Sequence, residues 1–135
     1  MKALVADDDA TTCALLCAVL DELGHDPEAV ADGAAAWQRY QEAKPPLVVL
    51  DIIMPQLDGI EVCRRIRQAD DKHETFVLVL TGRDQPGDLA AVLDAGADDY
   101  VAKPATAEHI RARLVIAERR SKQDIARRKA EAELA

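Results

Sequence analysis

The most constraining feature of the sequence is a regular alternation between short apolar runs and longer segments with helical periodicity. Apolar runs that do not alternate with polar residues are typical of strands covered by helices on both faces, as in parallel sheets. Strands are expected at 3–6, 28–31, 47–50, 76–80 and 99–102, of which 28–31 is the weakest. The first helix is expected after the first strand and ends before Gly24. Further helices are expected at 33–43, 60–68 and 88–95, and from 106 to the end. This order predicts an α/β fold with an open, doubly wound, five-stranded parallel sheet.

Polar residues follow four of the five expected strands directly. Asp7 and Asp8 follow the first apolar run, Asp51 the third, Thr81 the fourth and Lys103 the fifth. The carboxyl ends of the strands in such a sheet lie along one edge, where these folds bind their ligands. We therefore expect the five side chains to share one pocket.

The chemistry of this set points to phosphoryl transfer. Three carboxylates in one pocket repel one another unless they are protonated or share a cation, and hard oxygen ligands suit Mg²⁺ or Mn²⁺. Lys103 adds a positive charge and Thr81 adds a hydroxyl group. A carboxylate held between a dication and an ammonium group can attack phosphorus as a nucleophile.

The sequence around these residues resembles the receiver domain of response regulators in two-component signalling. The matching segments are Leu4-Val5-Ala6-Asp7-Asp8, Leu50-Asp51-Ile52-Ile53-Met54-Pro55-Gln56-Leu57-Asp58-Gly59, Leu80-Thr81-Gly82, Gly96-Ala97-Asp98-Asp99-Tyr100 and Lys103-Pro104. The likeness covers roughly residues 2–117. It implies a flavodoxin-like sheet with strand order 2-1-3-4-5, like that of chemotaxis regulators, and a cis Lys103–Pro104 bond.

The same resemblance assigns roles within the site. It implies that Asp51 accepts a phosphoryl group from a histidine kinase or a phosphotransfer protein, assisted by Lys103. It also implies that Thr81 and Tyr100 form a switch pair that responds to the new phosphate. The implied Mg²⁺ ligands are Asp8, Asp51 and the backbone carbonyl of Ile53, with Asp7 helping through water. The positions implied beside the phosphate are Ile52, Gly82, Arg83 and Pro104.

Two other classes of function fit the sequence less well. A phosphohydrolase with an aspartate nucleophile usually carries a second aspartate two residues later as an acid and base, and this position holds Ile53. A binding module that has lost phosphorylation would not need the complete set of five polar residues. We therefore expect a regulatory phosphoacceptor and not an enzyme. Because Ile53 cannot orient a water molecule, and because Arg83 can cover the phosphate, we expect a long-lived phosphorylated state.

Charge and composition exclude several other classes. The 135 residues carry a net charge of −8, and residues 118–135 contribute +2 of it, so the remainder carries −10. An acidic body disfavours nucleic acid, whose binding depends on phosphate neutralisation. The apolar runs are too short to cross a bilayer and the N-terminus lacks a signal peptide, so a cytoplasmic protein is expected. The three cysteines lack metal or redox spacing and are expected to be small buried hydrophobes, whereas the three histidines are expected at the surface or in loops.

The C-terminal region is longer than one domain of this kind needs. We expect a receiver domain at 1–117 and an extension of the last helix at 118–135 that links to a downstream output domain. A heptad pattern fails after Ala117, which favours a solvated helix over a coiled coil. The stretch 126–134 resembles helices that lead into PAS sensor domains. Pairing of two copies through the last strand and helices is a further expectation.

Overall fold

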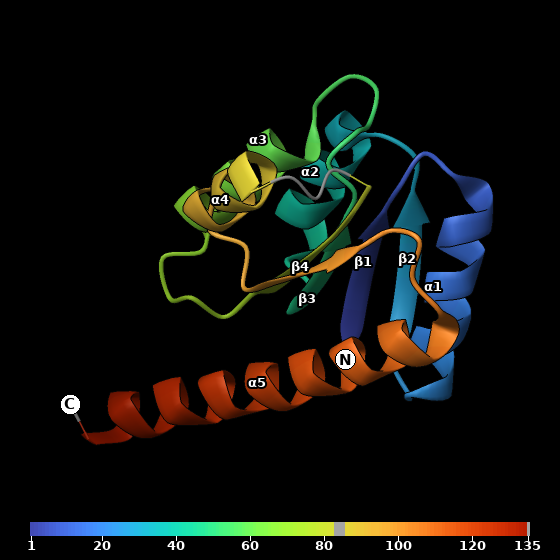
Figure 1. Ribbon diagram of the computed structural model, residues 1–135. Helices are drawn as coiled ribbons and strands as arrows, with labels where there is room; N and C mark the ends of the chain where they lie inside the picture. Colours follow the sequence, from blue (N-terminus) through green and yellow to red (C-terminus); the bar gives the residue numbers. More distant parts are fainter. Residues whose placement is uncertain (83–85, 135) are drawn as a thin grey trace.

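The computed structural model describes residues 1–82 and 86–134 (Figure 1). The described part contains five strands, β1 (Lys2–Ala6), β2 (Asp26–Val30), β3 (Leu47–Leu50), β4 (Phe76–Thr81) and β5 (Asp99–Ala102). It also contains five helices, α1 (Ala10–Glu22), α2 (Gly33–Ala43), α3 (Gly59–Ala69), α4 (Pro86–Asp94) and α5 (Ala107–Leu134). Strand and helix alternate throughout, as predicted.

The five strands form one parallel sheet with the order β2-β1-β3-β4-β5, which confirms the predicted order. The register pairs Ala6 of β1 with Leu50 of β3, and Thr81 of β4 with Ala102 of β5. The residues that follow these strands therefore leave the sheet at the same edge.

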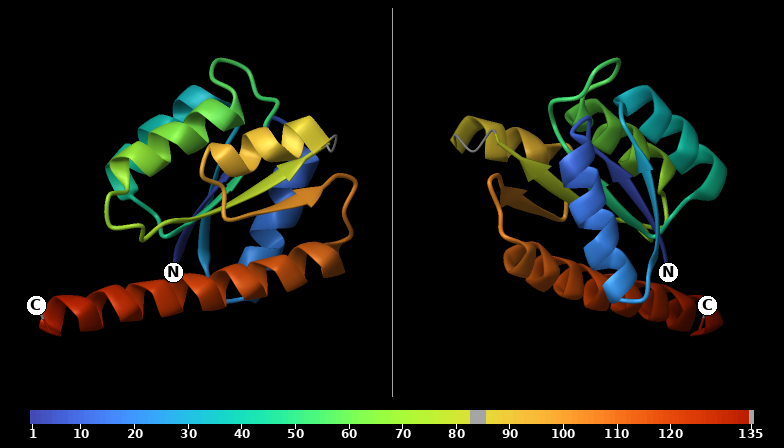
Figure 2. Two further views of the ribbon diagram at one scale, coloured as in Figure 1. Left: turned by 60° about the vertical axis from the view of Figure 1, so that its left-hand side comes forward. Right: turned by 90° about the vertical axis from the view of Figure 1, so that its right-hand side faces the viewer.

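Helices cover both faces of the sheet, and two apolar cores result (Figures 1 and 2). Successive strand residues point to opposite faces, which sends Val48 and Leu50 into one core and Leu47 and Val49 into the other. Helices α2, α3 and α4 close the first core, and α1 and α5 close the second. Burial on both faces explains why β3 reads as an unbroken apolar run.

Aspartates begin three of the helices. The carboxylates of Asp9, Asp32 and Asp58 accept hydrogen bonds from backbone N–H groups in the first turns of α1, α2 and α3. Asp9, which directly follows Asp7 and Asp8, is thus a helix cap. These caps satisfy backbone donors that have no partner within the helix.

One error in the predicted boundaries concerns β2. This strand runs from Asp26 to Val30, whereas 28–31 was expected. It lies at the edge of the sheet and pairs only with β1, so most of its residues stay exposed and carry no apolar pattern. The backbone of Asp26 is aligned by its N–H bond to the carbonyl of Met1, at 3.0 Å.

Helix α5 packs on the second core and then continues past the domain (Figure 2). Ile110 and Leu114 are buried, and burial extends to Ser121. The guanidinium of Arg120 lies 5.9 Å from the ring centre of Phe76, at the start of β4. Residues 122–134 are mostly exposed, in agreement with a solvated helix. Of the helices in the described part of the chain, none combines the length and apolar character needed to cross a bilayer.

The prediction for the cysteines is partly wrong, and His25, which lies in a loop within the expected range of positions, is buried. His25 is buried, with a side chain only 2% exposed, because the imidazole lies against α5 with its Nε2 atom 3.6 Å from a carboxylate oxygen of Glu118. The cysteines are free thiols, but only Cys63 is buried, while Cys13 and Cys17 of α1 are half-buried. Which side chains α5 and α1 cover depends on how the helices pack, which the local sequence does not specify.

Candidate functional site

The structure brings the predicted acidic residues together at the carboxyl edge of the sheet. Asp7 and Asp8 directly follow β1, and Asp51 directly follows β3. The parallel register aligns them, since the N–H of Asp51 donates to the carbonyl of Ala6 at 2.9 Å. One carboxylate oxygen from each of the three aspartates lies within 4.8 Å of the others. This group has the size and donor type of a divalent cation site.

Lys103 reaches the same cluster from the end of β5. Its Nζ donates to Oδ2 of Asp7 at 2.7 Å and to Oδ2 of Asp51 at 3.3 Å. Its backbone N–H donates to the carbonyl of Thr81 at 2.7 Å, which holds the lysine at the end of β4. One ammonium group therefore faces three carboxylates.

Burial and charge shift the pKa values of this cluster. Burial raises the pKa of Asp51, and the negative charge of Asp7 raises it further, while Lys103 opposes both. Burial alone lowers the pKa of Lys103, but the hydrogen bond to Asp7 and the charge of Asp51 outweigh it, so this pKa is raised. Lys103 thus keeps its proton and its positive charge, but this one charge does not neutralise the three carboxylates. A dication fits this remaining negative charge.

Asp7 is the most rigidly held of the three aspartates. Its side chain is buried, and its Oδ1 accepts the N–H of Asp9 at 2.9 Å. The thiol of Cys13 donates to the backbone carbonyl of Asp7 at 3.1 Å, a contact that the sequence reasoning missed. The only signal for it was the position of Cys13 in the first turns of the following helix. Asp8 is exposed and so is open to an incoming ligand.

The loop after Asp51 alternates buried and exposed side chains. Ile52 and Met54 are buried in the first core, whereas Ile53 is 59% exposed. The side chain of Ile52 thus belongs to the core of the domain. Gly82 lies beside open space, because a Cβ atom added there would meet nothing within 4 Å. Arg83 lies outside the described residues.

The proposed switch residues lie on neighbouring strands. Thr81 ends β4 with a fully buried side chain, and Tyr100 of β5 is half-buried against the first core. The register pairs Tyr100 with Val79, two residues before Thr81. Because strand residues alternate between faces, Thr81 and Tyr100 point to the same face of the sheet.

Comparison with known proteins assigns this arrangement to a family. The family model described as "Response regulator receiver domain" matches residues 3–115. The chain belongs to the response regulator receiver family.

Two curated relatives and one solved structure illustrate this membership. The response regulator MprA of Mycobacterium leprae is 41% identical over 124 residues, which are 92% of this chain and 54% of the relative. The alkaline phosphatase synthesis transcriptional regulatory protein PhoP of Bacillus subtilis is 40% identical over 120 residues, 89% of this chain and 49% of the relative. The chain thus spans about half the length of these relatives. A BeF3-activated DrrB receiver domain superposes with a TM-score of 0.79 at 30% identity, covering 87% of this chain and 97% of that one.

The receiver domain carries an apolar groove beside Lys103. This groove of about 350 Å³ lies between α1 and the connection from β5 to α5, and the cis Lys103–Pro104 bond predicted from the resemblance forms part of its wall. Leu15 of α1 and Ile110 of α5 line the opposite side. The groove adjoins the acidic cluster and belongs to the same edge of the molecule.

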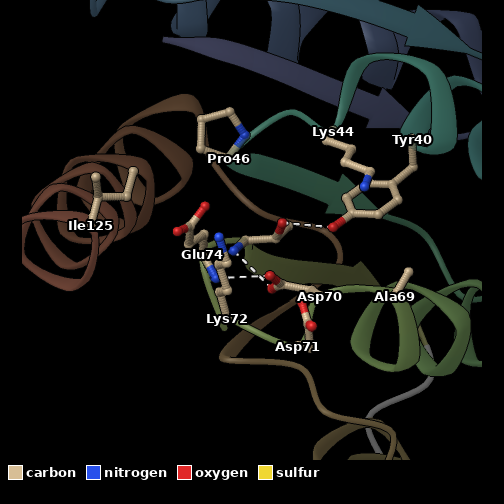
Figure 3. Close-up of a pocket in the computed structure, with 10 residues that line it drawn as sticks. Tyr40, Lys44, Pro46, Ala69, Asp70, Asp71, Lys72, Glu74 and Ile125 are labelled. Carbon is tan, nitrogen blue, oxygen red and sulfur yellow. Dashed lines mark hydrogen bonds between the residues drawn. The ribbon is translucent and has the colours of Figure 1, made fainter. Parts of the chain in front are cut away.

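Another cavity, of about 420 Å³, lies at the opposite edge of the receiver domain (Figure 3). The hydroxyl groups of Tyr40 and Thr75 are 2.9 Å apart within it, and the carboxylate of Asp70 accepts the N–H groups of Glu74 and Thr75. Ile125 of α5 lies at its side. Among the described residues, the candidate metal-binding group is the acidic cluster at the other edge, and the carboxylates of this cavity do not form one.

Proposed function

We propose that this receiver domain is a phosphoacceptor switch in which Asp51 receives a phosphoryl group. One observation carries the proposal: the carboxylate of Asp51 lies in a group of three aspartates and 3.3 Å from the ammonium of Lys103. The BeF3-activated state of the DrrB receiver domain gives further support, because trifluoroberyllate resembles a phosphoryl group in charge and shape.

The acidic cluster would hold a Mg²⁺ ion, or Mn²⁺ by the same preference for oxygen ligands. We assign the ligands to Asp8, Asp51 and the backbone carbonyl of Ile53, with Asp7 helping through water. When bound, the ion supplies positive charge that stabilises the phosphoryl oxygens.

The side chains of this chain perform the transfer in a simple sequence. An oxygen of Asp51 forms a bond to phosphorus as the bond between phosphorus and the donor nitrogen of a phosphohistidine breaks. The ammonium of Lys103 stabilises the negative charge on the transferring group, and the hydroxyl of Thr81 donates to it. Asp7 keeps Lys103 in place through its 2.7 Å hydrogen bond. The domain promotes its own phosphorylation and slow dephosphorylation, and is not a turnover enzyme.

The response to phosphorylation rests on Thr81 and Tyr100. We infer that movement of the threonine hydroxyl toward the phosphate opens space on the shared face of the sheet, and that the half-buried tyrosine ring then turns inward. The surface formed by α4, β5 and α5 would change as a result. Two copies would pair through this surface.

The partners follow from family membership and chain length. We propose a histidine kinase or phosphotransfer protein in the cytoplasm as the donor, docking near the apolar groove beside Lys103, and an output domain as the target. The relatives are about twice as long as this chain, so residues 118–135 would link residues 1–117 to that output domain. Because residues 126–134 resemble helices that lead into PAS sensor domains, the proposed output domain contains a PAS domain. Because residues 1–117 are acidic, we propose that this domain does not bind nucleic acid itself.

Mass spectrometry after incubation with acetyl phosphate and Mg²⁺ tests the proposal. The wild-type chain should gain about 80 Da, the mass of one phosphoryl group, and the added mass should map to Asp51. Asp51→Asn removes the nucleophile with little change in shape and should gain nothing. Asp21→Asn, an exposed position on α1, is the matched control and should behave as wild type.

The same experiment separates the competing functions. A phosphohydrolase would release inorganic phosphate without accumulating the adduct. A binding module without phosphorylation would show no change in mass and no phosphate release. Phosphorylation of Asp51→Asn to the wild-type level would refute the assignment of the acceptor.

A further inference from the structure

The loop between β3 and α3 contains a strained turn next to the phosphorylation site. Gln56 has a positive φ of 74°, which residues other than glycine rarely adopt. The N–H of Leu57 donates to the carbonyl of Pro55 at 2.9 Å and closes a γ-turn around Gln56. Such a conformation is unfavourable and persists only where the surroundings hold it. Contacts from outside the turn must therefore fix it.

Gly33, the first residue of α2, makes such a contact. Its N–H donates to the same carbonyl of Pro55 at 3.3 Å. A Cβ atom at Gly33 would lie 1.6 Å from the backbone oxygen of Leu57 and 2.5 Å from its carbonyl carbon. The φ of Gly33 is not in the positive range, so the backbone itself does not demand glycine here. The close approach of the loop demands it.

The two ends of this contact are both anchored. On the α2 side, Asp32 caps the helix with a 2.7 Å bond to the N–H of Ala35, which fixes where Gly33 lies. On the loop side, Gly59 closes the loop by donating to the carbonyl of Ile52 at 2.8 Å. A Cβ atom at Gly59 would lie 2.0 Å from the carbonyl oxygen of Asp51. The loop is thus held at its middle by Gly33 and at its base by Gly59.

We propose that Gly33 is a positioning residue of the phosphorylation site. It touches neither Asp51 nor a phosphate, but it holds the middle of the loop so that the carbonyl of Ile53 faces Asp8 and Asp51. This inference rests on the proposed function, because it assigns Gly33 a task within that site. It links α2, the helix that follows the edge strand β2, to the geometry of the acidic cluster.

Gly33→Ala is the direct test, with Gly87→Ala as its matched control. Gly87 lies in α4, where an added Cβ atom would meet nothing within 4 Å. In Gly33→Ala the loop or the start of α2 must shift by more than 1 Å, and misplacement of this size can slow a reaction by about 100-fold. We expect phosphorylation by acetyl phosphate to slow by about 10-fold or more, and the Mg²⁺ dissociation constant to rise. Gly87→Ala should match wild type in both.

Further variants separate positioning from a general loss of stability. Asp32→Ala removes the cap of α2 without adding an atom, and should slow phosphorylation and weaken Mg²⁺ binding by smaller factors than Gly33→Ala. Val19→Ala weakens the core on the opposite face of the sheet, and should change neither value at temperatures where the protein is folded. All measurements refer to the folded fraction determined by circular dichroism.

The outcomes decide the inference independently of the proposed function. Wild-type rate and Mg²⁺ affinity in folded Gly33→Ala would overturn it. If Gly33→Ala does not fold, wild-type values in Asp32→Ala would overturn it instead. A wild-type chain that takes up no phosphoryl group would refute the proposed function, and the Mg²⁺ titrations would still decide whether Gly33 positions the loop.

Discussion

Replacing Lys103 by methionine should destabilise the protein in a way that depends on pH and on Mg²⁺. The ammonium lies 2.7 Å from an oxygen of Asp7 and 3.3 Å from one of Asp51, whose side chains are only 1% and 8% exposed. At these distances the gross attraction is roughly 5–6 kcal/mol per pair at an effective dielectric constant of about 20. Methionine has a similar length, so the change mainly removes the charge.

The net loss of stability is smaller than the gross attraction. Removing one partner of a buried ion pair typically costs about 3–5 kcal/mol. The side chain of Lys103 is 26% exposed, so water already screens part of the interaction. We therefore expect the free energy of unfolding at pH 7 to fall by about 2–3 kcal/mol without Mg²⁺, which lowers Tm by roughly 10 °C.

The pH dependence follows from the direction of the pKa shift. Burial already raises the pKa of Asp51 in the wild type, and loss of Lys103 raises it further. A carboxyl group with a raised pKa in the folded state destabilises the protein at neutral pH and ceases to do so as acid protonates it. The difference between Lys103→Met and wild type should therefore shrink between pH 7 and pH 4.5. Added Mg²⁺ should stabilise the variant more than the wild type, because the dication replaces the lost positive charge.

Urea unfolding followed by circular dichroism measures these differences, in EDTA and in Mg²⁺. Lys122→Met is the matched control, because this lysine of α5 is 64% exposed and forms a surface pair with Glu118. A surface pair contributes about 0–1 kcal/mol, so the control should remain close to wild type at pH 7, both in EDTA and in Mg²⁺. Equal stability of Lys103→Met and wild type, or a loss that neither acid nor Mg²⁺ reduces, would refute the electrostatic coupling of this cluster.

Three further predictions concern the metal, the lifetime of the phosphorylated state and the buried histidine. Asp8→Ala removes a direct metal ligand and should weaken Mg²⁺ binding by at least about 10-fold, since even loss of an outer partner has an effect of this size; an unchanged isothermal titration would contradict the assigned site. Ile53→Asn places beside Asp51 an amide that can orient a water molecule, and should speed loss of the phosphoryl group after the donor is removed. Wild type should keep the phosphoryl group for minutes or longer. Decay of the phosphorylated protein, followed on Phos-tag gels, tests both expectations. Burial, with the positive charges of the N-terminus and Lys122, lowers the pKa of His25 against the opposing effect of Glu118. The stability that depends on neutral His25 is therefore present above pH 6.5, and it is lost as the pH falls through the lower pKa that His25 has in the folded protein. The urea midpoints of wild type and His25→Gln should therefore differ less at pH 5.5 than at pH 7.5.

The sequence was sufficient to predict the sheet and the acidic cluster because both depend on local, periodic features. The run Leu47–Leu50 is buried on both faces, so its apolar character identifies a central strand without knowledge of its neighbours. Once parallel strands are established, Asp7 and Asp51 must leave the sheet at one edge. The helix cap at Asp9 is equally local, because its carboxylate bonds to the N–H two residues later.

The edge strand and the histidine show where such reasoning fails. Residues of β2 face solvent on an edge, so no apolar pattern marked Asp26 as part of the strand. His25 follows a helix and a glycine, a setting typical of exposed residues, yet it is buried because α5, more than eighty residues later, packs over it. Burial of this kind depends on contacts that are remote in sequence.

The sequence by itself therefore determined the order of strands and helices, the edge at which the acidic cluster lies, and the three aspartates and the lysine that meet there, since each follows from patterns within a few residues. The tertiary structure decided how those residues are held. The contact of Gly33 with Leu57 and the network of Arg67 with Gly96, Thr75 and Asp98 join segments that have no pattern in common. Only the packed molecule brings these backbones and side chains within reach, because their closeness results from the helices and strands between them.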